Sequence, residues 1–93
     1  MSQLILVLEE NLEIQRLITS CFKDSEISVI NETNPEMFLR RVNDQMPDLI
    51  FLSNSDSDQD YKVCREIRGN LSFDKIPIIL LLNAKDKFDD NLL

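Results

Sequence analysis

The sequence contains no histidine and no tryptophan, and it has a single glycine among its 93 residues. Without histidine, the chain has no imidazole to act as a general base or as a metal ligand. With one glycine, it cannot build the glycine-rich loop that cradles a phosphate or a nucleotide. These absences argue against an enzyme, and we expect no catalytic residue in this chain.

Basic residues are also few: 10 Lys and Arg stand against 17 Asp and Glu, and the formal net charge is −7. Such a surface repels the phosphate backbone of nucleic acids, so we expect no nucleic-acid partner. No apolar run is long enough to span a membrane, and the first residues lack a secretory signal pattern. We therefore expect a cytoplasmic protein without membrane contact, in which Cys21 and Cys64 are reduced and buried.

Short apolar runs alternate with amphipathic segments along the chain. The runs that predict buried strands are Leu4–Leu8, Ile27–Ile30, Leu49–Leu52 and Ile76–Leu82. Between them, apolar residues recur at spacings of three and four, which is typical of helices packed on one face. Asn11 and the pair Asn34-Pro35 predict the starts of two helices, and Gly69 predicts the end of a third.

This alternation predicts one α/β domain over residues 1–93, with a parallel sheet and helices on both faces. The organising stretch is Pro47–Ser53, a buried strand that opens at its carboxyl end into a loop rich in acids. Open α/β sheets place their ligand sites at the carboxyl ends of the strands. Any site of this chain is therefore expected around Ser53.

Four stretches, in this order, resemble the receiver domain of bacterial two-component response regulators. They are Ile5–Asn11, Pro47–Leu52, Asp60–Arg68 and Ile76–Ile79. The resemblance covers essentially the whole chain and implies a flavodoxin-like three-layer sandwich with four parallel strands in the order 2-1-3-4. It also implies a truncated domain that lacks the fifth strand, the last helices and the phosphate-binding lysine of the family.

The resemblance implies that Ser53 stands where the family carries its phosphoacceptor aspartate. That aspartate is both a nucleophile and a Mg²⁺ ligand, and an unactivated serine hydroxyl is neither at neutral pH. The switching hydroxyl of the family is matched here by Leu82 or Asn83, and neither side chain carries a hydroxyl. We therefore expect Ser53 not to be phosphorylated.

Glu9 and Glu10 stand where the family carries its acidic pair, and they admit two interpretations. The first is a residual Mg²⁺ site that also uses a backbone carbonyl near Asn54. The second is a pair of solvated acids that are stabilised by the dipole of the following helix. Apart from weak Mg²⁺ binding in the first interpretation, we expect no cofactor.

The last predicted strand would leave an open sheet edge rich in Ile and Leu, unless the chain is a fragment of a longer protein. Such an edge is prone to pair with another chain. We expect protein partners there, such as a signalling component or an output domain, and a homodimer or an exchange of strands between two copies. The expected interface residues are Ile76, Ile78, Leu80 and Leu82.

The sequence and the resemblance together favour a phosphorylation-independent pseudo-receiver that acts as a protein-interaction module in two-component (phosphorelay) signal transduction. The first alternative is a receiver that keeps Mg²⁺- or phosphate-responsive switching through Glu9 and Glu10. The second alternative is a small flavodoxin-like enzyme, against which the missing glycine loop argues.

Overall fold

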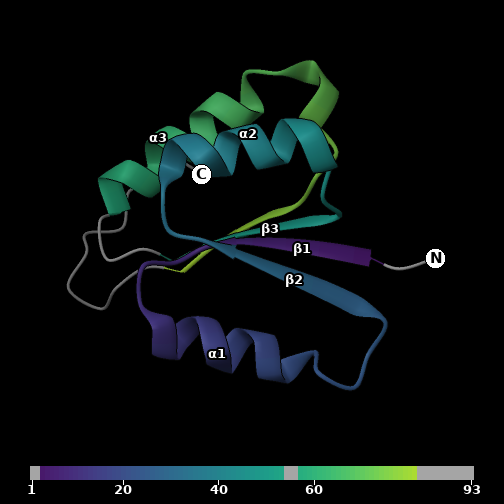
Figure 1. The fold of residues 1–93 in the computed structure, drawn as a ribbon. Helices are drawn as coiled ribbons and strands as arrows, with labels where there is room; N and C mark the ends of the chain where they lie inside the picture. Colours follow the sequence, from purple (N-terminus) through teal and green to yellow (C-terminus); the bar gives the residue numbers. More distant parts are fainter. Residues whose placement is uncertain (1–2, 54–56, 82–93) are drawn as a thin grey trace.

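The computed structural model describes residues 3–53 and 57–81, in which strands and helices alternate in the predicted order (Figure 1). The strands are β1 (Gln3–Leu8), β2 (Ile27–Glu32), β3 (Leu49–Leu52) and β4 (Ile78–Leu80). The helices are α1 (Leu12–Cys21), α2 (Pro35–Gln45) and α3 (Ser57–Arg68), and a short 3-10 helix, η1 (Leu71–Phe73), precedes β4.

All strand pairs are parallel, and the sheet order is β2-β1-β3-β4. Figure 1 shows α1 on one face of the sheet and both α2 and α3 on the other. This is a flavodoxin-like arrangement, and it confirms the predicted fold class. No helix in the described ranges has the length and apolar character that a membrane crossing requires.

The hydrophobic core lies between the sheet and the pair α2 and α3. Its buried members include strand residues and helix residues that face them: Leu6, Leu8, Ile50, Leu52, Phe38, Val42, Val63 and Ile67. Burial of one such side chain stabilises the fold by roughly 1.5–3 kcal/mol. The four residues that β1 and β3 contribute alternate with residues of the opposite face, as the period of a strand requires.

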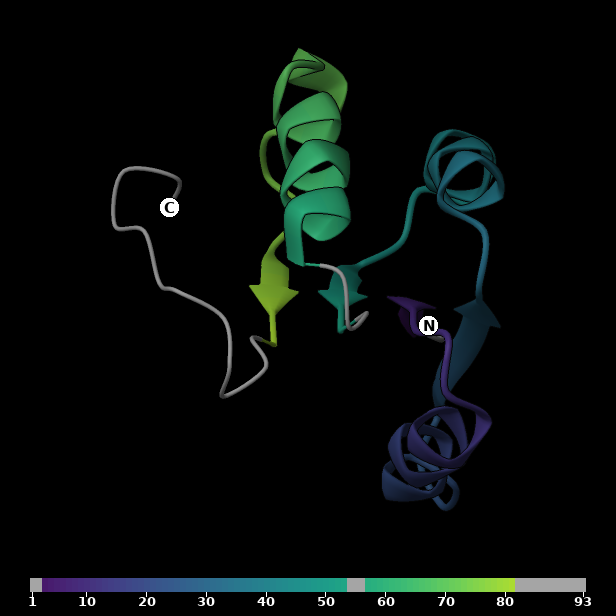
Figure 2. The same ribbon diagram turned by 90° about the vertical axis from the view of Figure 1, so that its left-hand side faces the viewer.

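The face that carries α1 is covered much less completely. No residue of α1 is buried, and Leu17 is 66% exposed. By alternation, Ile79 and Leu81 belong to this face, and they are 42% and 48% exposed. Figure 2 shows α1 beneath the β2 side of the sheet, with β4 at the opposite edge and no described helix beneath it.

The predicted helix starts are confirmed by side-chain hydrogen bonds. Asn11 Oδ1 accepts the backbone N–H groups of Glu13 and Ile14, at 2.8 and 3.3 Å, and so caps α1. Asn34 Oδ1 accepts the N–H of Met37 at 3.0 Å and caps α2, which begins at Pro35. The first four N–H groups of a helix lack partners within it, and these asparagines supply one.

The helix ends differ in one respect from the sequence prediction. Gly69 does follow α3, but it has no positive φ and is not a left-handed cap. The left-handed residue is instead Met46, with φ of 46°, at the end of α2. Asn70 then caps η1 by accepting the N–H of Ser72 at 2.9 Å, so the chain turns directly from α3 into a second short helix.

The predicted strand Ile76–Leu82 is too long, because β4 contains only Ile78–Leu80. The N–H of Ile76 bonds to Phe73 O at 3.2 Å and so belongs to the preceding turn. Pro77 has no N–H to offer a neighbouring strand. Leu82 and Asn83, the two positions matched to the switching hydroxyl of the family, lie outside the described residues.

Candidate functional site

The candidate site lies at the carboxyl ends of the two central strands, β1 and β3. These strands pair along their whole overlap, from Ile5 opposite Leu49 to Leu8 opposite Leu52. The N–H of Ser53 continues the ladder by bonding to Leu8 O at 3.0 Å. Glu9 and Ser53, which immediately follow the two strands, are thereby brought side by side although they are 44 residues apart in the sequence.

The side chain of Glu9 is almost completely buried, with 1% of its surface exposed. Its Oε2 accepts a hydrogen bond from the Ser53 hydroxyl, and its Oε1 accepts the backbone N–H of Asn11 at 2.9 Å. The interpretation of Glu9 as a solvated acid is therefore wrong. The apolar run of β1 ends at Leu8, and the sequence does not reveal that the next residue also points inward.

The backbone of Glu9 is held as firmly as its side chain. Its N–H bonds to Glu32 O at 3.0 Å, which extends the pairing of β1 with β2 by one residue. Its carbonyl oxygen accepts a hydrogen bond from Gln15 Nε2 at 2.6 Å, on the second turn of α1. The carboxylate is thus positioned by two strands and by the first helix.

This geometry determines what the site can bind. Both oxygens of the Glu9 carboxylate already accept hydrogen bonds from the chain, which offset much of the cost of burying a charge. A serine hydroxyl that donates its proton to a carboxylate is a neutral partner, unlike a second carboxylate, which would add charge for a cation. Glu10 is exposed, and no group of three metal-ligating side chains occurs within residues 3–53 and 57–81.

A second carboxylate at this edge of the sheet, Glu32 at the end of β2, has a structural role. Its Oε1 forms an ion pair with Arg41 Nε at 3.1 Å, and its Oε2 accepts the N–H groups of Thr33 and Asn34. The N–H of Asn34 contributes most to lowering the pKa of Glu32, with further contributions from Arg41 and Thr33, while burial acts in the opposite direction. Glu32 therefore fixes the turn between β2 and α2.

The predicted interface residues that the structure describes lie on the core side of the β4 edge. Ile76 is buried, with 9% exposed surface, and Ile78 and Leu80 pack against the core. The exposed apolar side chains at this edge are instead Ile79 and Leu81. The interface itself stays a prediction, and Leu82 and Asn54 belong to the parts of the chain that the structure does not describe.

The two cysteines do not form a bond with each other, since they belong to α1 and α3 on opposite faces of the sheet (Figure 1). Cys21 is exposed, so its predicted burial is wrong. Cys64 is half-buried, and this burial raises the pKa of its thiol. A half-buried thiol with a raised pKa is a poor nucleophile, which agrees with a packing role.

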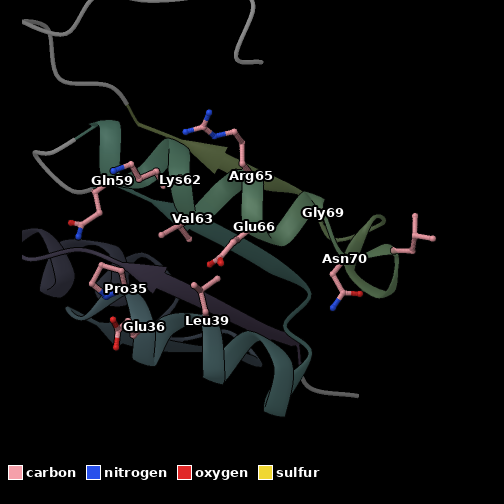
Figure 3. Close-up of a pocket in the computed structure, with 11 residues that line it drawn as sticks. Pro35, Glu36, Leu39, Gln59, Lys62, Val63, Arg65, Glu66, Gly69 and Asn70 are labelled. Atoms are coloured by element: carbon pink, nitrogen blue, oxygen red, sulfur yellow. The ribbon is translucent and has the colours of Figure 1, made fainter.

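A groove between α2 and α3 was not predicted from the sequence. It has a volume of about 1120 Å³, and Figure 3 shows Leu39 of α2 facing Val63 and Glu66 of α3 across it. Lys62 and Arg65 line the side of the groove that is farther from α2, and Leu71 lies beyond the end of α3.

Comparison of the sequence with known protein families and with curated proteins found no match. The order of the strands alone defines the class of this protein, which is a flavodoxin-like α/β domain.

Proposed function

We propose that this protein is a phosphorylation-independent, receiver-like protein-interaction module of a cytoplasmic two-component pathway. The proposal combines the resemblance of its motifs to receiver domains with the observed sheet order, which agrees with that resemblance. It assigns no reaction and no nucleic-acid partner to the protein, in keeping with its net charge of −7 and its single glycine. The function resides in the surface of the domain.

The observation that carries the proposal is the hydrogen bond from the Ser53 hydroxyl to the buried Glu9 carboxylate. In a phosphoryl-accepting receiver, the residue at this position must attack phosphorus and share a cation with neighbouring acids. Here the hydroxyl is a donor to the acid, and each oxygen of the acid already accepts one hydrogen bond, from Ser53 or from Asn11. These contacts favour a site that is closed to both a cation and a phosphoryl group.

Incubation with acetyl phosphate and Mg²⁺, followed by intact-mass spectrometry, tests this proposal. We expect no phosphorylated species, because the Ser53 hydroxyl replaces the carboxylate that, in a receiver, both attacks phosphorus and binds the cation. Accumulation of a species heavier by one phosphoryl group, mapped to Ser53, would contradict the proposal.

A second candidate is a receiver that responds to Mg²⁺ through Glu9 and Glu10. The observation in its favour is the position of the buried Glu9 carboxylate at the carboxyl end of β1, next to the exposed Glu10. In that case a cation would have to displace the Ser53 hydroxyl from Glu9. This candidate requires Mg²⁺ binding that depends on Glu10.

The proposed docking surface for a protein partner is the edge formed by β4. Pro77 O and Leu81 N bond to β3, so by alternation the backbone groups of Ile78 and Leu80 point away from the sheet. An added strand would satisfy these groups, and the exposed Ile79 and Leu81 would pack against it. The added strand comes from a protein partner or from a second copy, in a homodimer or by exchange of strands.

A further inference from the structure

We infer that the α2–α3 groove is a second association surface, and that its occupant is α3 of a second copy of this chain. This inference rests on the groove and on the charge pattern of α3, and it is independent of the β4 edge. The two surfaces are formed by different elements.

The side of α3 that faces away from the core carries a regular stripe. Gln59, Lys62, Glu66 and Gly69 follow one another at spacings of three and four, so they lie along one line of the helix surface. All four residues are exposed, and Figure 3 shows them along the groove. One base and one acid therefore stand next to each other near the middle of the helix.

The charges of this stripe are complementary to those of the same stripe on a second copy of α3 that runs antiparallel to the first. Lys62 and Glu66 lie at equal distances on either side of Cys64. A two-fold axis that crosses the stripe midway between Lys62 and Glu66 therefore puts Lys62 of each copy opposite Glu66 of the other copy. Two ion pairs form across such an antiparallel contact.

The two charges are available for this contact. Although Lys62 and Glu66 are four residues apart on one helix, they form no ion pair, and the one ion pair within the described ranges joins Arg41 and Glu32. The order from base to acid along the helix is also the less favourable one for a pair within a helix. A second copy offers each of them a partner of opposite sign.

The single glycine of the chain fits the same contact. Gly69 has no positive φ, and among the residues that the structure describes a Cβ there would meet only Arg65 O and Glu66 O of α3, at 3.4 and 3.5 Å. The fold of one copy therefore does not require glycine at this position. About the same two-fold axis, Gly69 lies opposite Gln59 of the second copy, and the missing side chain lets the two helices approach closely.

Apolar surface next to the stripe completes the contact. Leu71, the first residue of η1, is 84% exposed, and Leu39 of α2 is half-buried on the other side of the groove. Both side chains line the groove. A second α3 laid into the groove covers this apolar surface, which a monomer leaves in water.

A charge-exchange experiment tests the inference. Lys62→Glu makes the stripe wholly acidic, and Glu66→Lys makes it wholly basic. We expect each variant alone to self-associate about tenfold more weakly than the wild type, because two attractive pairs become repulsive. An equimolar mixture of the two variants should recover association as a heterodimer, which native mass spectrometry identifies when one variant is labelled with ¹⁵N.

The matched controls are Lys23→Glu and Glu26→Lys, which change the net charge equally at exposed positions after α1. They should associate as the wild type does. Leu71→Glu should also weaken association, and far-UV circular dichroism verifies that each variant is folded. The inference is overturned if the wild type is monomeric, if either stripe variant alone associates as the wild type does, or if their mixture forms no heterodimer.

The outcome also distinguishes this surface from the β4 edge. Association that survives both stripe variants but is lost on substitution of Ile79 belongs to the edge alone. Failure of the charge exchange therefore leaves the proposed interaction module intact.

Discussion

Glu9 is a carboxylate that folding removes almost entirely from water, and two donors from its own chain accompany it. One donor is the backbone N–H of Asn11, which every residue except proline would supply. The other is the hydroxyl of Ser53, which depends on the identity of that side chain. At the scale of single residues, Ser53 is therefore the position at which the chemistry of the site is determined.

Substitutions of Ser53 test this role. Ser53→Ala should lower the free energy of unfolding by about 1–3 kcal/mol, because it leaves one oxygen of a buried carboxylate without its donor. Ser53→Asp should destabilise the fold in the absence of cations, because it places two carboxylates in contact, and millimolar Mg²⁺ should restore part of the loss. Urea denaturation with and without Mg²⁺ measures both effects.

The matched control is Ser28→Ala, at an exposed position of β2, which should change stability by less than about 0.5 kcal/mol. A Ser53→Ala variant as stable as the wild type would show that the hydrogen bond to Glu9 contributes nothing.

Glu32 gives a second prediction at this scale, on pH. Because the pKa of Glu32 is lowered in the folded state, its charged form is favoured by folding. The resulting stability is present above the ordinary pKa of a glutamate and is lost as the pH falls through the lowered pKa. Glu32→Gln should cost about 1 kcal/mol at neutral pH and make the acid side of the stability profile shallower.

Denaturation midpoints between acid and neutral pH measure this effect. Glu36→Gln, which neutralises an exposed carboxylate in the first turn of α2, is the matched control. Parallel profiles for the wild type and Glu32→Gln in the acid range would contradict the assigned role of Glu32.

At the scale of elements, sequence signals predicted α2 best. Asn34 and Pro35 mark its start as predicted, and Pro47 bars its continuation beyond the observed bounds of Pro35–Gln45. The fourth strand was predicted too long, because an apolar run alone does not show which of its residues form hydrogen bonds to the neighbouring strand. Ile76 is apolar because it is buried beside η1, not because it is part of the sheet.

The site was predicted in position but not in its contacts. The order of the strands places Glu9 and Ser53 at one edge of the sheet, and this much follows from the alternation of elements. Glu9 accepts hydrogen bonds from the side chains of Ser53 and Gln15, which no local pattern connects to it. The α2–α3 groove likewise depends on how two helices pack.

The cap of α2 supports a prediction at this scale. Asn34→Ala should lower the free energy of unfolding by about 1 kcal/mol, because the N–H of Met37 loses its acceptor. Thermal or urea unfolding measures it. Asn43→Ala, at an exposed position inside the same helix, is the control and should be neutral or slightly stabilising.

At the scale of the whole molecule, the two faces of the sheet are covered unequally. Two helices and a continuous core cover one face, whereas the other has α1 with no buried residue and leaves Ile79 and Leu81 exposed at the β4 edge. Apolar surface of this kind is typical of a protein that associates with another chain. The proposed function as an interaction module agrees with this asymmetry.

Ile79→Lys tests the contribution of the β4 edge. A lysine on an edge strand opposes pairing with another strand, so self-association through this edge should weaken by about tenfold or more. The side chain of Ile79 is 42% exposed, and the fold should tolerate the change. Sedimentation velocity over a range of concentrations measures association, with Met46→Lys, an exposed position at the end of α2, as the control. Unchanged association would exclude the edge as an interface between copies.

The central claim is that the contact between Ser53 and Glu9 closes the site to the ligands that switch a receiver domain. The most direct measurement is a titration with Mg²⁺ and beryllofluoride, followed by the NMR amide shifts of Glu9, Asn11 and Ser53. We predict that the changes in these shifts during the titration do not saturate, and that they are the same in the wild type and in Glu10→Gln. Shifts that saturate at millimolar Mg²⁺ and vanish in Glu10→Gln would contradict the claim and establish the Mg²⁺-responsive receiver in its place.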